Sequence, residues 1–286
     1  EHIGVYRYHF YARKEWKDKC IRILFDGIQH FSTVYLNGKK IGERPYGYVP
    51  FLCDLTNILD FDQENVLVVW VDNRDFSNGS WSAYGGDRWY SGAGIYRKVW
   101  LLVQDLTHIA HDGIRILSKP LHHGPNGDVP DVAGIRCDTA SVSIQAELEG
   151  DLQNCEFYIA VCDHQENEVF TCSLPAENII NHHFLLQKPF LWTIETPILY
   201  RAVFMLKKNG MMLDKHTVRF GIRTAIFDEE DGFVLNGKKT KLWGVNLHHD
   251  GASVGAAVPI EVWERRLKVL KSLGVNTIRA SHNPMA

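Results

Sequence analysis

The sequence predicts a mostly β protein, with two antiparallel β-sandwiches followed by the first elements of a barrel of alternating strands and helices. Strand patterns follow one another at short intervals from residue 3 to residue 223, and no helical period appears in the first hundred residues. The period becomes helical after Pro259, and one more strand pattern follows that helix. Strand, helix and strand in about forty residues form a β–α–β unit, whose two strands are parallel.

The first predicted domain, residues 1–105, fits an antiparallel sandwich or jelly roll. Residues 33–36 run into Asn37-Gly38, which is the strongest short signal for a β-hairpin. Residues 66–71 form a continuous apolar run, which is typical of a strand buried on both faces. Closely spaced strands without a helix indicate one of these all-β folds.

The second predicted domain, residues 106–224, fits an immunoglobulin-like sandwich, because many short strand patterns fall within roughly a hundred residues. Residues 119–130 are rich in turn-forming residues and are predicted to be a loop. The strand patterns after this loop span residues 140–148, 155–162, 169–174, 183–187, 200–206 and 215–220.

The third predicted domain, residues 225–286, fits the start of a (β/α)₈ TIM barrel. Residues 240–247 and 275–280 fit two parallel strands. The helix between them starts near Pro259 and ends before Gly274, with apolar residues at spacings of three and four. The apolar face of this helix consists of Ile260, Trp263, Leu267, Leu270 and Leu273.

Both predicted barrel strands end in side chains that can bind ligands. His248, His249 and Asp250 follow the first strand, and His282 follows the second. Because the functional groups of a TIM barrel lie at the C-terminal ends of its strands, the position of these residues predicts a site. No metal site is predicted, since adjacent histidines on a continuing strand point to opposite faces.

The composition argues against several classes of protein. A formal net charge of −3 gives no electrostatic reason to expect a nucleic acid or an anionic membrane as a partner. No apolar run of about eighteen residues predicts a membrane span. The six cysteines form no Cys-x-x-Cys pair, so neither a zinc ribbon nor a disulfide framework is predicted. Because the chain begins at Glu1 within a strand pattern and without Met, we expect a fragment at both ends.

The most distinctive segment, residues 88–97 (RWYSGAGIYR), is a loop with an aromatic pair and two glycines. These residues alone also fit a sandwich loop whose Trp89 and Tyr90 fill the core. The segment resembles the signature of the sugar-binding domain of glycoside hydrolase family 2. Residues 242–251 (LWGVNLHHDG) and 276–284 (NTIRASHNP) resemble the first two barrel strands of the same family.

The resemblance covers nearly the whole chain. It implies a jelly-roll sugar-binding domain, an immunoglobulin-like domain and a catalytic TIM barrel. Residues 248–251 (HHDG) are most similar to those of β-galactosidases, which implies hydrolysis of terminal β-D-galactosides in carbohydrate metabolism. The implied partner is a β-galactoside or oligosaccharide substrate. The family is compatible with a homo-oligomer and favours the bacterial periplasm or secretion, although the composition leaves the compartment open.

The resemblance assigns substrate binding to three residues. Asp87 matches a carboxylate that accepts hydrogen bonds from sugar hydroxyls. His248 and His282 match histidines that bind the glycone, although each also fits a structural role in a core or as a cap. Supporting positions in the same motifs are Arg88, Trp89, Asn246, His249, Asp250, Arg279 and Asn283.

A retaining glycosidase needs two carboxyl groups about 5–5.5 Å apart. The resemblance implies that both are glutamates from later barrel strands. No catalytic residue is therefore expected before Ala286, and this chain is predicted to be inactive. No cofactor is expected in the chain either. The resemblance implies that the intact enzyme can bind Mg²⁺ or Na⁺ near the barrel mouth, through ligands later in the sequence.

Three alternatives remain open. The same family contains β-glucuronidases and β-mannosidases. The chain could also be a non-catalytic carbohydrate-binding protein, or a structural array of sandwiches. Two barrel strands and one helix alone would expose a large apolar surface, which favours an enzyme over a free-standing binding domain.

Overall fold

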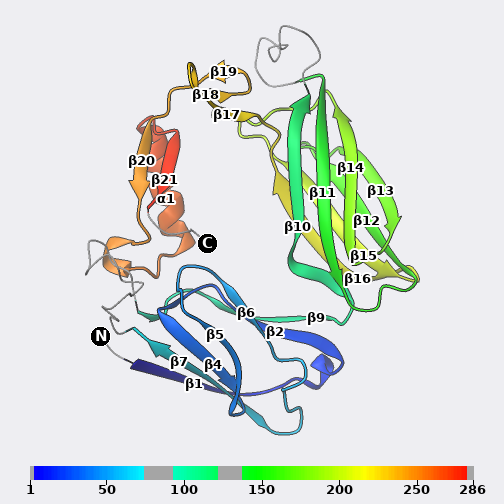
Figure 1. Cartoon of the computed structure of the whole chain (residues 1–286), viewed down its shortest axis with the longest axis vertical. Coiled ribbons are helices and arrows are strands. Elements are labelled where there is room, and N and C mark those ends of the chain that lie inside the picture. The colour runs from blue at the N-terminus through cyan, green and yellow to red at the C-terminus, as the bar shows by residue number, and fades with distance from the viewer. Residues whose placement is uncertain (1–2, 74–92, 122–136, 282–286) are drawn as a thin grey trace. The chain divides into compact units, whose positions relative to one another are not determined.

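The structure is a computed structural model that describes residues 3–73, 93–121 and 137–281 (Figure 1). Strands make up most of the regular structure, and α1 (Ile260–Ser272) is the one α-helix within these ranges. The predicted mostly β class is confirmed. In the same ranges, no helix is long and apolar enough to cross a membrane.

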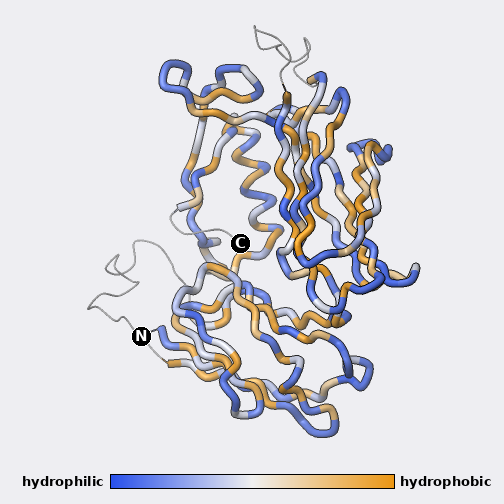
Figure 2. Tube along the Cα trace, turned by 45° about the vertical axis from the view of Figure 1, so that its right-hand side comes forward, coloured by the Kyte–Doolittle hydropathy of each residue, from blue (hydrophilic) through white to orange (hydrophobic). Residues whose placement is uncertain are grey.

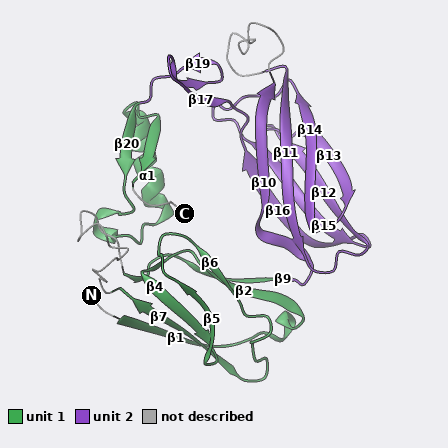
Figure 3. Cartoon of the chain, in the orientation of Figure 1, with its two compact units in different colours: residues 1–103, 243–286 green, residues 104–242 purple. Residues whose placement is uncertain are grey.

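The chain divides into two compact units (Figure 3). Unit 1 comprises residues 1–103 together with 243–286, and unit 2 comprises residues 104–242. Unit 1 is therefore discontinuous in the sequence. Apolar and polar residues alternate along many strands of both units (Figure 2), as expected for sheets that turn one face to a core.

The first part of unit 1 is a β-sandwich. Its main sheets have the strand orders β1-β7-β4-β5 and β6-β2-β9, and β3 pairs with β8 in a separate ribbon. Buried side chains from both sheets, among them Ile23, Val34 and Val69, form one hydrophobic core. The elements are β1 (Ile3–Tyr11), the 3₁₀ turn Lys14–Trp16, β2 (Lys19–Phe25), β3 (Ile28–Gln29), β4 (Phe31–Leu36), β5 (Lys39–Arg44), β6 (Phe51–Asp54), β7 (Glu64–Asp72), β8 (Gly94–Ile95) and β9 (Val99–Asp105).

Strand β7 differs from the strand expected over residues 66–71. Its side chains alternate between buried, such as Leu67 and Val69, and half-buried, such as Val68 and Trp70. β7 lies between β1 and β4 in a sheet that packs one face on the core. The expectation of burial on both faces is therefore wrong.

The hairpin predicted at Asn37-Gly38 is confirmed by the pairing of β4 with β5. Asn37 has φ 52° and Gly38 has φ 77°, the left-handed values that a type I′ turn requires. The Asn37 side chain is also anchored to the neighbouring strand. Its Nδ2 donates to Asn65 Oδ1 at 2.9 Å, and its Oδ1 accepts from the Val66 N–H at 2.8 Å.

Unit 2 contains a second sandwich, with strand orders β10-β11-β14 and β13-β12-β15-β16. Apolar side chains of both sheets, including Ile144, Phe157 and Phe204, share one core. The strands are β10 (His108–Leu121), β11 (Thr139–Glu149), β12 (Cys155–Cys162), β13 (Glu168–Pro175), β14 (Ile179–Gln187), β15 (Tyr200–Lys208) and β16 (Met211–Phe220).

The first residues of the loop predicted over residues 119–130 belong to a strand instead. Lys119 and Pro120 belong to β10, where Pro120 lies opposite Ala140 of β11. The rest of the predicted loop, from residue 122, lies outside the described residues. Pairing with β11 therefore overrides the local turn signal at the end of β10.

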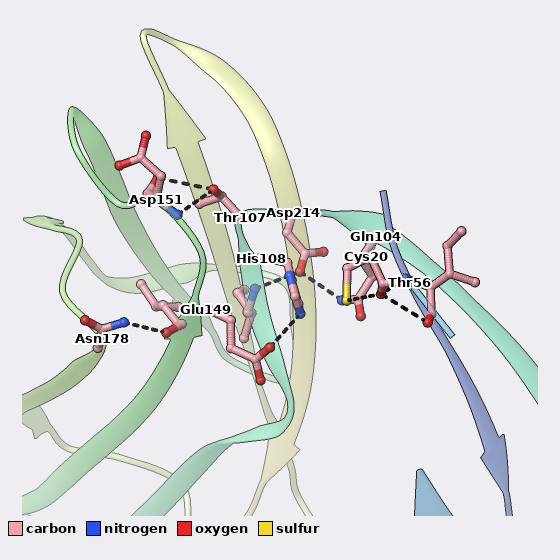
Figure 4. A network of polar contacts seen from close by, with 12 residues as sticks. Cys20, Thr56, Gln104, Thr107, His108, Glu149, Asp151, Asn178 and Asp214 are labelled. Atoms are coloured by element: carbon pink, nitrogen blue, oxygen red, sulfur yellow. Dashed lines mark hydrogen bonds and ion pairs between the residues drawn. The ribbon is translucent and has the colours of Figure 1, made fainter. Parts of the chain in front are cut away.

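A polar network fixes the start of β10 within unit 2 (Figure 4). The buried His108 has its Nε2 3.4 Å from Glu149 Oε2. Asp214 Oδ2 accepts hydrogen bonds from the Ile109 N–H at 3.0 Å and from Gln104 Nε2 at 3.3 Å. The Asp214 carboxylate therefore binds the backbone and a side chain of the segment that leads into the sandwich.

Unit 2 ends in a small antiparallel sheet, and unit 1 resumes with a parallel strand pair. β20 and β21 are parallel, with α1 between them in the sequence. The helix stops before Gly274, whose φ of 86° confirms the predicted glycine stop. The strand predicted over residues 240–247 is confirmed only in its second half. The elements are β17 (Ala225–Asp228), β18 (Gly232–Leu235), β19 (Lys238–Lys239), β20 (Gly244–Leu247), the 3₁₀ turn Ala252–Val254 and β21 (Thr277–Ala280).

Candidate functional site

The ends of β20 and β21 bring two predicted site residues side by side. The parallel register places Asn246 opposite Arg279, and both residues are exposed. Beyond the strands, the Ser281 N–H donates to Leu247 O at 2.9 Å. Arg279 Nη1 in turn donates to Ser281 Oγ at 3.2 Å. The bond between Ser281 and Leu247 thus keeps the two segments together just beyond the end of β21.

The histidine pair lies in the loop after β20, because the strand ends at Leu247. His248 is half-buried, whereas His249 is only 7% exposed and turns into the protein. Asp250 is half-buried, and its carbonyl accepts a hydrogen bond from Arg266 of α1. The rule that neighbouring strand residues face opposite ways does not apply to His248 and His249, since neither belongs to the strand.

His249 contacts two residues of the sandwich within unit 1. Arg97 Nη2 lies 3.3 Å from His249 Nδ1. The Tyr48 ring packs against the His249 ring, with centroids 5.0 Å apart. Arg97 Nη1 also donates to Tyr48 O at 2.9 Å and to Asp26 O at 3.3 Å. One guanidinium group therefore joins two sandwich loops to the loop after β20.

Tyrosine side chains surround this guanidinium group. The Tyr96 hydroxyl donates to Gly47 O at 3.0 Å, and the Arg97 guanidinium lies 5.0 Å from the centre of the Tyr96 ring. Burial raises the pKa of Tyr96 to about 12, although the charge of Arg97 opposes the rise. Burial also raises the pKa of Tyr48, and nearby Tyr46 adds to the effect. These phenols are therefore neutral at physiological pH and act as fixed hydrogen-bonding groups.

Several predicted site residues lie outside the part of the chain that the structure describes, so their roles stay predictions. These residues are Asp87, Arg88, Trp89, His282 and Asn283.

Reasoning from the sequence missed the cluster around His249. Arg97 closes the motif of residues 88–97, so its presence in a site could have been suspected. Tyr48 carries no comparable local signal. Its role depends on contacts between residues that are far apart in the sequence.

The described residues contain no group of three or more His, Cys, Asp or Glu side chains placed to hold a metal ion. All six cysteines are free thiols. The binding of Mg²⁺ or Na⁺ by an intact enzyme stays a prediction.

Three consecutive segments match models of a single protein family. Residues 1–105 match the sugar-binding domain of glycosyl hydrolases family 2, and residues 131–223 match a second model of that family. Residues 227–286 match its TIM-barrel domain. The chain belongs to glycoside hydrolase family 2. The predicted family and the succession of jelly-roll, immunoglobulin-like and TIM-barrel folds are thereby confirmed.

Family 2 relatives match along almost all of the chain. A β-galactosidase of Bacteroides ovatus is 36% identical over 99% of this chain and 32% of its own length. A β-glucuronidase of Bacteroides fragilis is 30% identical over 99% of this chain and 40% of its own length. The chain thus spans about a third of the length of these curated relatives.

Solved family 2 structures share the fold. A β-glycosidase from Bacteroides vulgatus superposes with a TM-score of 0.84 at 33% identity, over 99% of this chain and 34% of that one. A β-glucuronidase from Bacteroides uniformis superposes with a TM-score of 0.83 at 30% identity, also over 99% of this chain and 34% of that one. The names of the relatives therefore agree on glycoside hydrolysis and differ on the sugar.

Proposed function

We propose that the whole protein is a retaining glycoside hydrolase that removes terminal β-D-galactosyl groups, and that this chain supplies part of its sugar-binding site. The galactose preference is supported by the 36% identical relative, a β-galactosidase. The sequence of residues 248–251 (HHDG), which resembles that of β-galactosidases, supports the same sugar.

The observation that carries this proposal is the convergence of ligand-binding groups at the ends of two parallel strands. Asn246 and Arg279 are neighbours across β20 and β21, and His248 follows directly. In TIM barrels this edge of the strands holds the active site. Neutral and charged donors at one edge suit a sugar, because each hydroxyl both donates and accepts hydrogen bonds.

The proposed chemistry needs two carboxyl groups about 5–5.5 Å apart, one as acid/base and one as nucleophile. In the whole protein, we assign both to glutamates of later barrel strands. Asp87, His248 and His282 would then bind the glycone and hold its flattened ring in the oxocarbenium-like transition state. The 286-residue chain alone is accordingly expected to hydrolyse no glycoside.

β-Glucuronidase activity is the second candidate, favoured by relatives of that name at 30% identity. A glucuronide carries a carboxylate that galactose lacks, so its site needs an additional cationic partner. The two candidate functions can therefore be distinguished by the relative rates at which the enzyme hydrolyses galactosides and glucuronides.

A panel of nitrophenyl β-glycosides, assayed on the whole protein and on the 286-residue chain, tests the proposal. We expect the galactoside to exceed the glucuronide and the mannoside in kcat/KM by at least about 100-fold, since buried polar groups without partners penalise the wrong sugar. The shorter chain should release no nitrophenol. Preference for the glucuronide would instead establish the second candidate.

His248 supplies the matched test of the site. We expect His248→Ala in the whole protein to lower kcat/KM for the galactoside roughly 10–100-fold, through the loss of one strong hydrogen bond. His183→Ala is the control, because His183 is exposed in unit 2 and contacts Ser143. Equal activities of the two variants would contradict the assigned role of His248.

A further inference from the structure

Arg97 is held in one orientation by contacts on several sides. Its guanidinium donates to the carbonyls of Tyr48 and Asp26, lies over the Tyr96 ring and reaches His249 Nδ1. A planar guanidinium group with two backbone acceptors has little freedom to rotate. The direction in which Arg97 presents its Nη2 to His249 is therefore fixed by the sandwich.

The contact between Arg97 and His249 also selects a chemical form of the histidine. Arginine has no acceptor atom, so its Nη2 must donate and His249 Nδ1 must accept. A neutral imidazole whose Nδ1 accepts carries its proton on Nε2. Arg97 thus favours the Nε2–H tautomer of His249.

The loop that follows β20 is fastened from two sides within unit 1. The sandwich holds it through His249, by the Arg97 hydrogen bond and by packing on Tyr48. Helix α1 holds it one residue later, where Arg266 donates to the Asp250 carbonyl. His248 lies between the end of β20 and these two attachments, so they set its backbone position.

We propose that Arg97 is a positioning residue, which fixes the tautomer and place of His249 and thereby holds His248 at the end of β20 in position to bind the sugar. This inference rests on the proposed sugar-binding role of His248. Arg97 itself touches no sugar in this scheme. It is half-buried and does not belong to the core of the sandwich, so its loss should disturb the site more than the fold.

Steady-state kinetics of the whole protein on a nitrophenyl β-galactoside test the proposal. We expect Arg97→Gln to lower kcat/KM roughly 10–100-fold, because small displacements of a binding group have effects of this size. The reduction in kcat/KM should come from KM and kcat in the same proportion as in His248→Ala. A merely structural role would reduce the fraction of active enzyme, which lowers kcat and leaves KM unchanged.

A double variant provides a further kinetic test. Arg97→Gln combined with His248→Ala should be hardly less active than His248→Ala alone, because Arg97 acts through that residue. The matched control is Arg201→Gln, because Arg201 is a half-buried arginine of unit 2 that is paired with Glu166. The proposal would be overturned if Arg97→Gln had the kcat/KM of the wild type. It would also be overturned if the kcat/KM of the double variant were reduced by the product of the two single reductions. Where Arg97→Gln does not fold, His249→Gln removes the same hydrogen bond from the other side and is judged by the same criteria.

Histidine ¹⁵N NMR of the 286-residue chain gives a readout that needs no sugar. The His249 signals, assigned with His249→Gln, should show the Nε2–H tautomer in the wild type and a mixture of tautomers in Arg97→Gln. An Nδ1–H tautomer in the wild type would overturn the inference even if the enzyme is active. A whole protein that hydrolyses none of the glycosides would instead overturn the proposed function, and the NMR result would still decide whether Arg97 orders His249.

Discussion

Gly47 has no room for a side chain beside the candidate site. A Cβ atom at this position would lie 2.1 Å from Gln29 Oε1 and 2.7 Å from the backbone oxygen of Ile28. The Gln29 side chain could move, but the Ile28 carbonyl belongs to β3 and is fixed by pairing with β8. The carbonyl of Gly47 also accepts the hydrogen bond from Tyr96.

We therefore expect Gly47→Ala to lower the free energy of unfolding of unit 1 by about 1–3 kcal/mol, the usual cost of overpacking. Urea unfolding of the 286-residue chain measures it. Gly4→Ala is the matched control, because a Cβ at Gly4 would meet only the Tyr6 ring, at an ordinary distance of 3.8 Å. An equal change in the free energy of unfolding of both variants would show that a side chain at Gly47 causes no steric destabilisation.

The sequence predicted that some residues of the candidate site lie together and missed other contacts, for a physical reason. Asn246 and Arg279 could be placed near each other because each occupies a predicted strand, and parallel strands end at the same edge. The contact between Arg97 and His249 joins residues 152 positions apart. No local pattern encodes it, since it depends on how two separate segments pack.

The turn between β12 and β13 shows how one side chain can close an element. Asp163 Oδ1 accepts from the Gln165 N–H at 2.8 Å and from the Asn167 N–H at 2.9 Å. Asn167 Nδ2 adds a bond to Oδ2 at 3.0 Å. Burial pushes the pKa of Asp163 up, but these hydrogen bonds outweigh it and leave the pKa below its usual value.

Because the pKa of Asp163 is lower in the folded state, the carboxylate stabilises the fold above the unfolded pKa of about 3.9. That contribution is lost as the pH falls through the folded pKa. We expect Asp163→Ala to lower the free energy of unfolding of unit 2 by roughly 1–3 kcal/mol near neutral pH, and the deficit to shrink below about pH 4. Urea unfolding at several pH values measures it.

The exposed Asp231, which pairs with Lys239, provides the comparison for Asp163. Asp231→Ala should change stability by less than about 1 kcal/mol, as usual for a surface ion pair. A deficit in Asp163→Ala that stays constant down to pH 3 would contradict the assigned origin of the effect.

Elements with strong local chemistry were predicted well, and elements set by pairing were not. The turn at Asn37-Gly38 and the stop at Gly274 follow from left-handed backbone angles that Asn and Gly adopt readily. The extension of β10 to Leu121 depends instead on β11, which supplies partners for residues that locally favour a turn. Tertiary pairing decides such strand ends.

At the scale of the molecule, the two units have separate hydrophobic cores. Phe25 lies in the core of unit 1 and Phe157 in that of unit 2, and both are fully buried. Calorimetry of the 286-residue chain should therefore resolve two transitions. We expect Phe157→Ala to lower the transition of unit 2 alone, with a loss of about 3–5 kcal/mol.

Phe227→Ala serves as the control for Phe157, because Phe227 is 78% exposed. It should leave both transitions nearly unchanged. One common transition, shifted by Phe157→Ala and by Phe25→Ala alike, would refute the independence of the cores.

The order of domains could be predicted because each carries its own motif or strand pattern. The sequence could not predict that residues 1–103 and 243–286 form one unit, since these two segments come together only through packing. Overall identity does not fix the sugar either, because relatives that are 36% and 30% identical are named β-galactosidase and β-glucuronidase.

The discontinuity of unit 1 has a consequence for the order of events during synthesis. A ribosome adds about 5–20 residues per second, so His249 follows Arg97 by roughly 8–30 s. The continuous segment of unit 2 emerges in that interval and can complete its own core first. During this interval, Arg97 and Tyr48 lack their contacts with His249, because His249 has not yet been synthesised. The proposed sugar-binding edge is thus expected to be among the last parts of the chain to assemble.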